Sequence, residues 1–457
     1  MTRAAARDIL RLAWPVTVAQ IATMANGVID TVMAGHYSAR ALAVVGLGSA
    51  IYMTIFVALM GILIALSPTI AQHHGAGRAD AITHDVRQGL WLAALIIIAS
   101  EPLLAFPGPL IALSGMQPEV AEEVRAYLRV LMWAMPAMML FRVFNSWATA
   151  ISQPRAVMVI QIAGLVLKVP LNWVLMYGHF GLPAMGGIGC AWALVIESWL
   201  MLAAAYVWMQ WHPVFLRYRV FARFEAPDWR AIGRLVALGV PIGVSFLIDV
   251  TSYTFMALFI ARLGEEWSAG HQIAANLGAL AYMVPLGLSS AAAVLVGQAI
   301  GAGDPVRARA AGFTGMVIGF CAALVVASAI ALGGTGIAGL YTSDARVAAV
   351  AAPLIVLVAC FHIFDASNAM ASNAVRGYKK AWVPMLTFAL SLWGVGLGGG
   401  YLLAFDNPLG ANMGAAGFWT GAIGGMALAA TIGAVYFDHV SRQAIRGQTT
   451  RHSSRRA

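Results

Sequence analysis

The stretch VPIGVSFLIDVTSYTFMALFI (240–260) decides the fold class of this chain, because it is almost wholly apolar and carries one charged residue, Asp249. A helix of this length crosses a hydrocarbon layer of about 30 Å at about 1.5 Å per residue. Asp30 and Asp365 lie inside comparable apolar stretches. An ionised carboxylate at mid-bilayer costs about 3 kcal/mol on insertion scales, so it is retained where it meets water, an ion or an opposite charge. Three such aspartates on three predicted helices indicate a polar route through lipid, and such a route indicates transport.

The composition places the whole chain in the membrane. Its 457 residues are 61% hydrophobic and 10% charged, with a mean hydropathy of +0.80, whereas roughly a quarter of the residues of a soluble protein are charged. The apolar stretches do not alternate with polar residues as the strands of a transmembrane barrel do. Twelve are long enough to span as helices, at residues 9–35, 41–72, 86–106, 120–151, 156–178, 187–211, 230–262, 267–300, 309–333, 346–374, 381–405 and 413–438.

Positive charges gather on one side of these predicted spans. Most of the 28 Lys and Arg residues fall near the two termini or in alternate loops that share a side, and the opposite loops contain acids such as Glu265 and Glu266. By the positive-inside rule, we expect both termini to be cytoplasmic. The net charge of +9 is then a consequence of membrane topology, and nucleic acid is not expected as a partner.

The sequence contains two copies of one pattern. Pro15 and Pro241 are 226 positions apart, and the same offset relates QHHGAG (72–77) to QAIGAG (298–303). FRVFN in the first half matches FHIFD in the second at an offset of 220, and loops of different length account for the drift. These matches predict two copies of a six-helix unit.

An even number of spans gives both copies the same orientation in the membrane. We therefore expect an all-α integral membrane protein with twelve transmembrane helices in two pseudo-symmetric six-helix lobes. The lobes are predicted at residues 1–211 and 230–457, the second with a basic cytoplasmic tail, and a cytoplasmic linker at 212–229 joins them. In proteins built from parallel repeats the substrate site usually lies between the halves, and transport proceeds by alternating access.

Two polar stripes in the second half predict a cation site. Residues three, four and seven apart share one face of a helix, which aligns Asp249 with Tyr253 on one helix and Phe361 with Asp365 on another. The stripes also contain Ser245, Ser252, Asn368 and Ser372. Hard cations prefer oxygen ligands, so Na⁺ fits between the two carboxylates, and two close like charges allow protons to compete for the site. The alternative is that each aspartate pairs with a polar neighbour and only fixes two helices together.

Polar residues of the first half form a second cluster. They are Thr23, Asn26 and Asp30 in the first span, Arg142 and Asn145 in the fourth, and Gln161, Lys168 and Asn172 in the fifth. Arg142 and Lys168 are the basic residues predicted to lie deep in the membrane, where each would neutralise an acid. Lys168 is expected to pair with Asp30, with Glu197 as another partner. Whether Asp30 carries protons or stays in a fixed ion pair is left open by the sequence.

Other polar features have less specific interpretations. Gln272 and Asn276, one turn apart, would line a cavity or form hydrogen bonds between helices. The glycine run GVGLGGG (394–400) is explained by close helix packing. His73 and His74 have no carboxylate at ligand spacing and are interpreted as a surface feature. No nucleotide, metalloprotease or nucleophile motif is present, so we expect neither an enzyme nor a cofactor.

The chain resembles the MATE (multidrug and toxic compound extrusion) transporters, specifically their NorM-like branch. The resemblance covers nearly the whole length and is carried by the order of several motifs: VIDTVMAG (28–35), VPLN (169–172), LGVP followed eight residues after its proline by Asp249, GHQIAAN (270–276), FDASNAMASNAVRGYKK (364–380) and GAAGFW (414–419). It implies a secondary antiporter in a bacterial inner membrane that exports amphipathic, often cationic drugs in exchange for Na⁺ or H⁺.

Positions in this chain that match the motifs of the branch imply particular roles. Asp249 and Asp365, with Phe361 where the branch often has Tyr, would bind the coupling cation in the C-terminal lobe. Asp30, Asn172 and Asn145 match the polar cluster of the N-terminal lobe, and Pro15 matches the proline at which the first helix bends in relatives.

Two departures from the branch and several rival functions remain. Asp249 replaces the usual Glu, and Lys168 replaces a common Asn with a permanent cation, which argues against a Na⁺ site in that lobe. A lipid-linked oligosaccharide flippase of the same superfamily is the main rival, although its cavity would need more basic residues. An intramembrane enzyme and a passive channel are two further rival functions. We expect a monomer whose partners are the lipid bilayer and small-molecule drugs.

Overall fold

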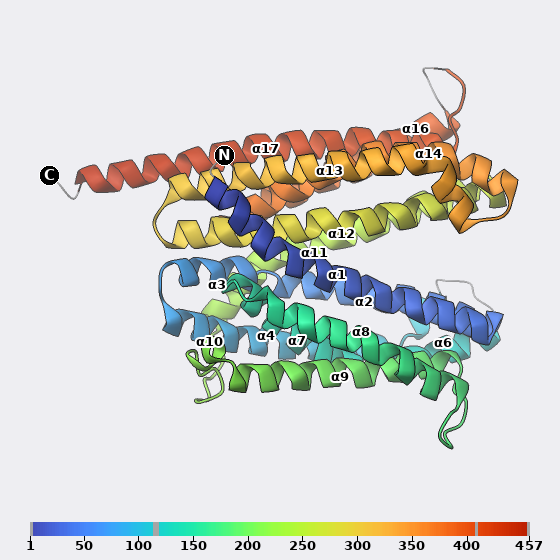
Figure 1. Cartoon of the computed structure of the whole chain (residues 1–457), viewed down its shortest axis with the longest axis horizontal. Helices are drawn as coiled ribbons and strands as arrows, with labels where there is room; N and C mark the ends of the chain where they lie inside the picture. Colours follow the sequence, from blue (N-terminus) through green and yellow to red (C-terminus); the bar gives the residue numbers. More distant parts are fainter. Residues whose placement is uncertain (1–2, 113–117, 407–409, 455–457) are drawn as a thin grey trace. The chain divides into compact units, whose positions relative to one another are not determined.

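The computed structural model describes residues 3–112, 118–406 and 410–454, and this part of the chain is built from helices joined by short turns, without a strand (Figure 1). The helices are α1 (Arg3–Tyr37), α2 (Ala39–Leu63), α3 (Leu66–Gly75), α4 (Ala79–Ala105), α5 (Gly108–Ala112), α6 (Pro118–Leu131), α7 (Ala134–Ala150), α8 (Pro154–Tyr177), α9 (Gly187–Trp211), α10 (Pro213–Leu216), α11 (Trp229–Ala261), α12 (Glu265–Gly301), α13 (Pro305–Tyr341), α14 (Ala345–Gly377), α15 (Trp382–Ala389), the π-helix η1 (Leu390–Gly399), α16 (Gly400–Phe405) and α17 (Ala415–Ser454).

The helices are long and apolar enough to cross a membrane. Eleven candidate spans are found among the described residues, and a twelfth is added if the bent pair α6–α7 is one span. The all-helical fold class with twelve spans, predicted from the sequence, is therefore confirmed, and the chain is a multi-pass membrane protein.

Prolines explain where two of the spans are interrupted. A proline inside a helix removes one backbone hydrogen bond and clashes with the carbonyl four residues before it. Pro68 acts in this way on Ile64, where α2 gives way to α3, and Pro136 acts on Met132, where α6 and α7 meet at 45°. At both places the chain forms tighter bonds over three residues, such as Ala65 N–H to the Ile62 carbonyl at 3.3 Å.

The chain forms two compact units whose border cuts through two helices. Val18–Gly243 make up the N-terminal unit, and Met1–Thr17 with Val244–Ala457 make up the C-terminal unit. The border thus follows Thr17 in α1 and Gly243 in α11, positions 226 apart, which is the offset between Pro15 and Pro241. The start of α1, the first helix of the first repeat, therefore belongs to the C-terminal unit. In the same way, the start of α11, the first helix of the second repeat, belongs to the N-terminal unit.

Small residues allow these helix starts to pack closely. A Cβ atom at Gly243 would lie 2.5 Å from the carbonyl oxygen of Ala58 in α2, inside the N-terminal unit. A Cβ atom at Gly287 of α12 would lie 2.0 Å from Oγ1 of Thr17, inside the C-terminal unit. Because real Cβ atoms do not approach so closely, both positions require glycine at this spacing.

The glycine run at 394–400 packs against α17. A Cβ atom at Gly421 would lie 2.6 Å from the carbonyl oxygen of Gly396, and one at Gly425 would lie 2.3 Å from the carbonyl oxygen of Ser391. The backbones of η1 and α17 therefore touch directly, and a Cβ atom at Gly400 would lie 2.9 Å from Cα of Phe418. The packing interpretation is confirmed for this part of the run, whereas a Cβ atom at Gly394 or Gly399 would meet nothing within 4 Å.

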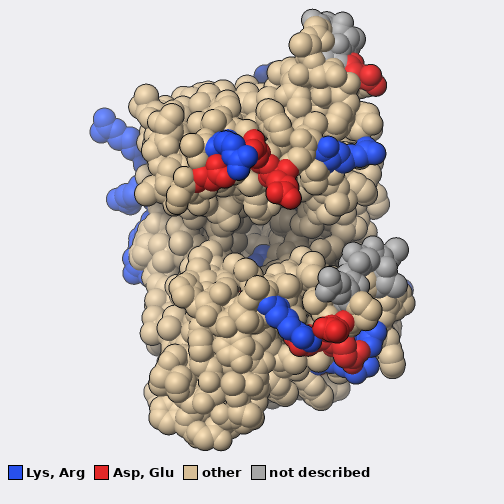
Figure 2. Space-filling view, turned by 90° about the vertical axis from the view of Figure 1, so that its right-hand side faces the viewer, with Lys and Arg blue, Asp and Glu red and all other residues tan. Residues whose placement is uncertain are grey.

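Arginines of α2 and α14 are paired with acids at one end of these helices. Figure 2 shows this end, on the right of Figure 1, where bases stand beside acids in small groups on a largely uncharged surface. Arg40 Nη2 lies 2.7 Å from Glu123 Oε1 in the N-terminal unit, and Arg346 Nη1 lies 3.0 Å from Glu266 Oε1 in the C-terminal unit. Arg40 and Arg346, on the side predicted to be external, are thus balanced by acids.

The interpretation of both adjacent histidines as surface features was wrong for His73. Its Nε2 lies 3.2 Å from Oδ2 of Asp85, which is buried. The carboxylate comes from α4, across the turn that follows α3, so spacing along a single helix could not reveal it.

Candidate functional site

A buried ion-pair cluster lies where α1, α8 and α9 meet in the N-terminal unit. Lys168 Nζ on α8 is 3.1 Å from Oδ2 of Asp30 on α1 and 3.6 Å from Oε2 of Glu197 on α9. Asn172 Nδ2 donates a hydrogen bond to Asp30 Oδ1 at 2.7 Å, and Asn26 Nδ2 donates one to Glu197 Oε1 at 2.8 Å. The predicted pairing of Lys168 with Asp30 is therefore confirmed, and Glu197 is a second, simultaneous partner.

Burial makes the charge balance of this cluster important. The side chain of Lys168 is 0% exposed and that of Glu197 is 1% exposed. Two carboxylates against one ammonium leave one negative charge in excess if both acids are ionised. An uncompensated buried charge is costly, so the cluster favours the uptake of one proton or the retention of strong hydrogen bonds from its asparagines. Thr23 Oγ1 of α1 also donates a hydrogen bond to Gln161 Oε1 of α8 at 3.1 Å, so a second polar contact joins two of the same helices.

A glycine makes room for Glu197. Gly164 lies one helical turn before Lys168 on α8, and a Cβ atom there would be 2.9 Å from Glu197 Oε1 and 2.8 Å from the sulfur of Met201. The absence of a side chain at this position lets α8 and α9 approach closely enough for the ion pair. Gly164 is not among the residues predicted from the sequence, although a glycine one turn from a buried lysine was a usable signal.

Two other polar residues of the N-terminal unit lie apart from this cluster. Asn145 accepts a hydrogen bond from Thr149 of the same helix at 3.3 Å, and no hydrogen bond among the described residues joins it to Asp30 or Lys168. The prediction that Arg142 neutralises an acid is not supported, because among the described residues Arg142 forms no ion pair and its buried Nε has no hydrogen-bond partner.

The C-terminal unit holds the second set of predicted residues. Tyr253 contacts Phe361 edge-on, with ring centroids 6.4 Å apart, and both rings contact Trp419 of α17, at 6.4 Å and 5.6 Å. Asp249 precedes Tyr253 by one turn on α11, and Asp365 follows Phe361 by one turn on α14. Because three chain reversals make these two helices antiparallel, the ring contact brings both carboxylates to the same side of the aromatic cluster.

Electrostatics also connect the two carboxylates. Asp249 and Asp365 lie within range of one another's charge and of the hydroxyls of Tyr253 and Tyr282. Tyr282, on α12, was not identified from the sequence because it is one of many aromatic residues in apolar spans. Both aspartates are half-buried, and neither forms an ion pair with Lys or Arg among the described residues. In this respect they differ from Asp30.

Neighbouring polar residues extend the two stripes. Ser372 Oγ donates to Asn368 Oδ1 at 3.3 Å, and both side chains are buried, as are those of Ser245 and Ser252. Gln272 and Asn276 of α12 are exposed. Asn276 accepts a hydrogen bond from the hydroxyl of Tyr341 of α13 at 2.9 Å, so for Asn276 the structure shows the interhelical hydrogen bond.

A bundle of membrane-spanning helices with buried or half-buried acids at two separate places has the features of a membrane transporter. The MatE family model matches residues 15–174 and 241–402, and the chain therefore belongs to the MatE family, whose members are transporters and not enzymes. The two matched segments cover both sequence repeats.

Relatives agree with this assignment. The chain is 41% identical to the probable multidrug resistance protein NorM of Aromatoleum aromaticum, over 92% of this chain and 91% of that protein. It is 38% identical to the multidrug resistance protein PmpM of Pseudomonas aeruginosa, over 97% of this chain and 93% of that protein. These matches support the resemblance to the NorM-like branch.

Solved MATE structures have the same fold. The eukaryotic MATE transporter AtDTX14 has a TM-score of 0.86 at 20% identity and covers 97% of this chain and 99% of its own. An outward-facing multidrug resistance MATE family transporter has a TM-score of 0.87 at 19% identity, with 97% of each chain covered.

Proposed function

We propose that this chain is a multidrug efflux transporter that exports amphipathic and cationic compounds in exchange for Na⁺ or H⁺ by alternating access. Its family and the names of its relatives support multidrug efflux. The distribution of acids in the two units supports the coupling to a cation. In this proposal the protein lies in a bacterial inner membrane with both termini in the cytoplasm.

The observation that carries the proposal is the difference between the two groups of acids. Asp30 is already paired with a buried ammonium 3.1 Å away, whereas Asp249 and Asp365 have no basic partner among the described residues. Two neighbouring carboxylates in a membrane protein need compensating positive charge. A mobile cation supplies that charge in turn with the cationic drug, so the aspartates of the C-terminal unit are the proposed exchange site, with Phe361 and Tyr253 forming its aromatic wall.

The N-terminal unit has a different proposed role. Lys168 occupies the centre of the cluster as a fixed positive charge, so a metal ion there would face electrostatic repulsion. We propose that this cluster exchanges no metal ion and that Glu197, Asp30 and Lys168 share at most one exchangeable proton. Asn172 and Asn26 keep the two carboxylates in place whether or not that proton is bound.

The driving force is sufficient for drug export. One elementary charge that crosses 100 mV supplies about 2.3 kcal/mol, which concentrates a neutral substrate about fortyfold at one-to-one coupling. Export of a cationic substrate by exchange for one monovalent cation moves no net charge, so the concentration gradient of the ion alone would drive it.

The test is export of a fluorescent cation such as ethidium from proteoliposomes, with Na⁺ and pH gradients imposed separately. Wild-type protein should move the dye against the concentration gradient of the dye when one of the two ion gradients is present. Asp249→Asn and Asp365→Asn should abolish this accumulation while the purified variants elute and melt as the wild type does. Full accumulation by both variants would refute the proposed exchange site, and dye movement without any ion gradient would indicate a passive channel.

A further inference from the structure

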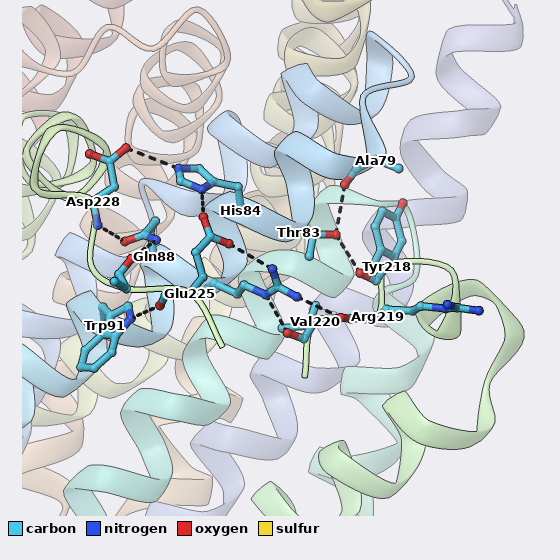
Figure 3. A network of polar contacts seen from close by, with 12 residues as sticks. Ala79, Thr83, His84, Gln88, Trp91, Tyr218, Arg219, Val220, Glu225 and Asp228 are labelled. Atoms are coloured by element: carbon cyan, nitrogen blue, oxygen red, sulfur yellow. Dashed lines mark hydrogen bonds and ion pairs between the residues drawn. The ribbon is translucent and has the colours of Figure 1, made fainter. Parts of the chain in front are cut away.

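The segment between α9 and α11 lies along the side of α4, inside the N-terminal unit. The carbonyl of Tyr218 accepts a hydrogen bond from Thr83 Oγ1 at 2.8 Å, and the carbonyl of Val220 accepts one from Arg87 Nε at 2.8 Å (Figure 3). Further along, the carbonyl of Glu225 accepts one from Trp91 Nε1 at 2.9 Å. Residues 218–225 are therefore held to successive turns of one helix.

These contacts indicate how deep the segment lies. Thr83 and Trp91 are eight residues apart on α4, which is about 12 Å along a helix. The sequence of α4 is polar as far as Gln88 and continues as GLWLAALIIIA (89–99). Phe224, whose ring centroid is 6.0 Å from that of Trp91, lies beside the first apolar turn. The segment thus reaches the level at which a helix passes from the headgroup region into hydrocarbon.

The acids of this segment face inward. Glu225 is bound to His84 and to Arg87, whose Nη1 lies 3.0 Å from its Oε2. Asp228 Oδ1 accepts hydrogen bonds from the backbone N–H groups of Arg230 and Ala231, at 2.9 Å and 3.3 Å. Figure 3 shows both carboxylates turned toward α4. The carboxylate of Glu225 is therefore paired with an arginine of α4, and that of Asp228 is hydrogen-bonded to backbone N–H groups at the start of α11.

The basic and aromatic side chains face outward. Arg217, Arg219 and Arg223 are exposed and form no ion pair within the described part of the chain. At Arg219 the backbone has φ of 45°, and its carbonyl accepts from Arg87 while its side chain points away from the network (Figure 3). Phe221 and Phe224 are 51% and 81% exposed. The outer face of the segment is therefore positive and aromatic.

We propose that residues 217–224 form a binding surface for anionic phospholipid headgroups. Guanidinium groups bind phosphate oxygens in pairs, and aromatic rings favour the boundary between headgroups and acyl chains. Under the proposed topology the surface faces the cytoplasmic leaflet, where anionic lipids attract basic segments. This lipid-binding surface depends on the membrane-spanning fold and does not depend on which ion is coupled to transport.

The test uses full-length protein in detergent micelles titrated with phosphatidylglycerol or, as a neutral reference, phosphatidylcholine, with bound lipid counted by native mass spectrometry. Wild-type protein should retain phosphatidylglycerol in preference to phosphatidylcholine, and salt should weaken the preference. Each arginine near an anionic surface contributes about fivefold in affinity, so replacing Arg217, Arg219 and Arg223 with Gln together should weaken phosphatidylglycerol binding about a hundredfold. The matching triple change to Lys keeps the charge but loses the paired hydrogen bonds, so it should bind more weakly than the wild type and more tightly than the Gln variant.

A matched control distinguishes this surface from total charge. Arg3, Arg7 and Arg11 of α1 are also exposed, and replacing all three with Gln removes the same charge outside the segment. This control variant should bind phosphatidylglycerol with an affinity less than about fivefold below that of the wild type. Equal losses in the two Gln variants, or wild-type affinity in the segment variant, would overturn the proposal. Unchanged melting in lipid-free micelles shows that each variant is folded, and a segment variant that melts early is replaced by its single substitutions.

Discussion

Replacing Lys168 with Met removes the only positive charge from the buried cluster of the N-terminal unit. The Met side chain keeps most of the apolar volume of the lysine stem. Asp30 and Glu197, which Lys168 Nζ approaches at 3.1 Å and 3.6 Å, both lose their ionic partner. Breaking one buried pair costs about 3–5 kcal/mol. Two acids are affected, although each keeps one hydrogen bond from an asparagine. We therefore expect the free energy of unfolding to fall by about 5 kcal/mol, the upper end of this range.

The neutral triple variant measures how much of this loss comes from unpaired charge. Combining Lys168→Met with Asp30→Asn and Glu197→Gln leaves no charge in the cluster, and we expect it to be about 3 kcal/mol more stable than Lys168→Met alone. The free energy of unfolding is measured by denaturant titration in detergent micelles at a fixed pH. The reasoning fails if Lys168→Met lies within about 1 kcal/mol of the wild type, or if the triple variant is as unstable as the single one.

Three further predictions concern helix packing and the segment along α4. Gly164→Ala should destabilise the protein by about 1–3 kcal/mol, because the added methyl would displace the α9 glutamate, and an unchanged melting temperature would contradict this. Gly46→Ala, where a Cβ atom meets nothing within 4 Å, should be neutral or stabilise by up to about 1 kcal/mol in the same assay. Burial raises the pKa of Glu225, but hydrogen bonds from His84 and Arg87 outweigh burial and lower it. The contribution of Glu225 to stability is therefore full above its unfolded pKa of about 4.3, and it is lost as the pH falls through the pKa in the folded protein. Hydrogen-exchange protection of residues 218–228 should therefore fall below about pH 4 in the wild type, and an equal fall in Glu225→Gln would contradict the assignment.

Much of the fold could be predicted because lipid imposes simple rules. Apolar length predicts the spans, and the 226-residue offset is the same offset that separates the two borders between the units. The Lys168–Asp30 pair was also predictable, because a buried lysine in lipid requires an acid and few acids lie in the spans. The interruptions before Pro68 and Pro136 were not placed in advance, although each proline is visible in its predicted span.

The remaining features depend on contacts between distant segments. Glu197 was expected as another partner of Lys168, but the room that Gly164 leaves for it does not follow from periodicity along one helix. The His73–Asp85 pair does not follow from that periodicity either. The position of residues 218–228 against α4 depends on backbone carbonyls, which every residue carries, so the sequence holds no distinctive signal for it. The sequence predicts a cytoplasmic linker at 212–229, but only the structure shows which of its side chains face outward.

The most direct test of cation exchange in the C-terminal unit is the number of Na⁺ ions or protons released when ethidium binds to purified protein in lipid nanodiscs. Wild-type protein should release one or more cations per bound dye, and the neutral triple variant of the N-terminal cluster should still do so. Asp249→Asn and Asp365→Asn should each reduce the release sharply. Undiminished release from both aspartate variants would contradict the claim that these two carboxylates hold the exchanged ion.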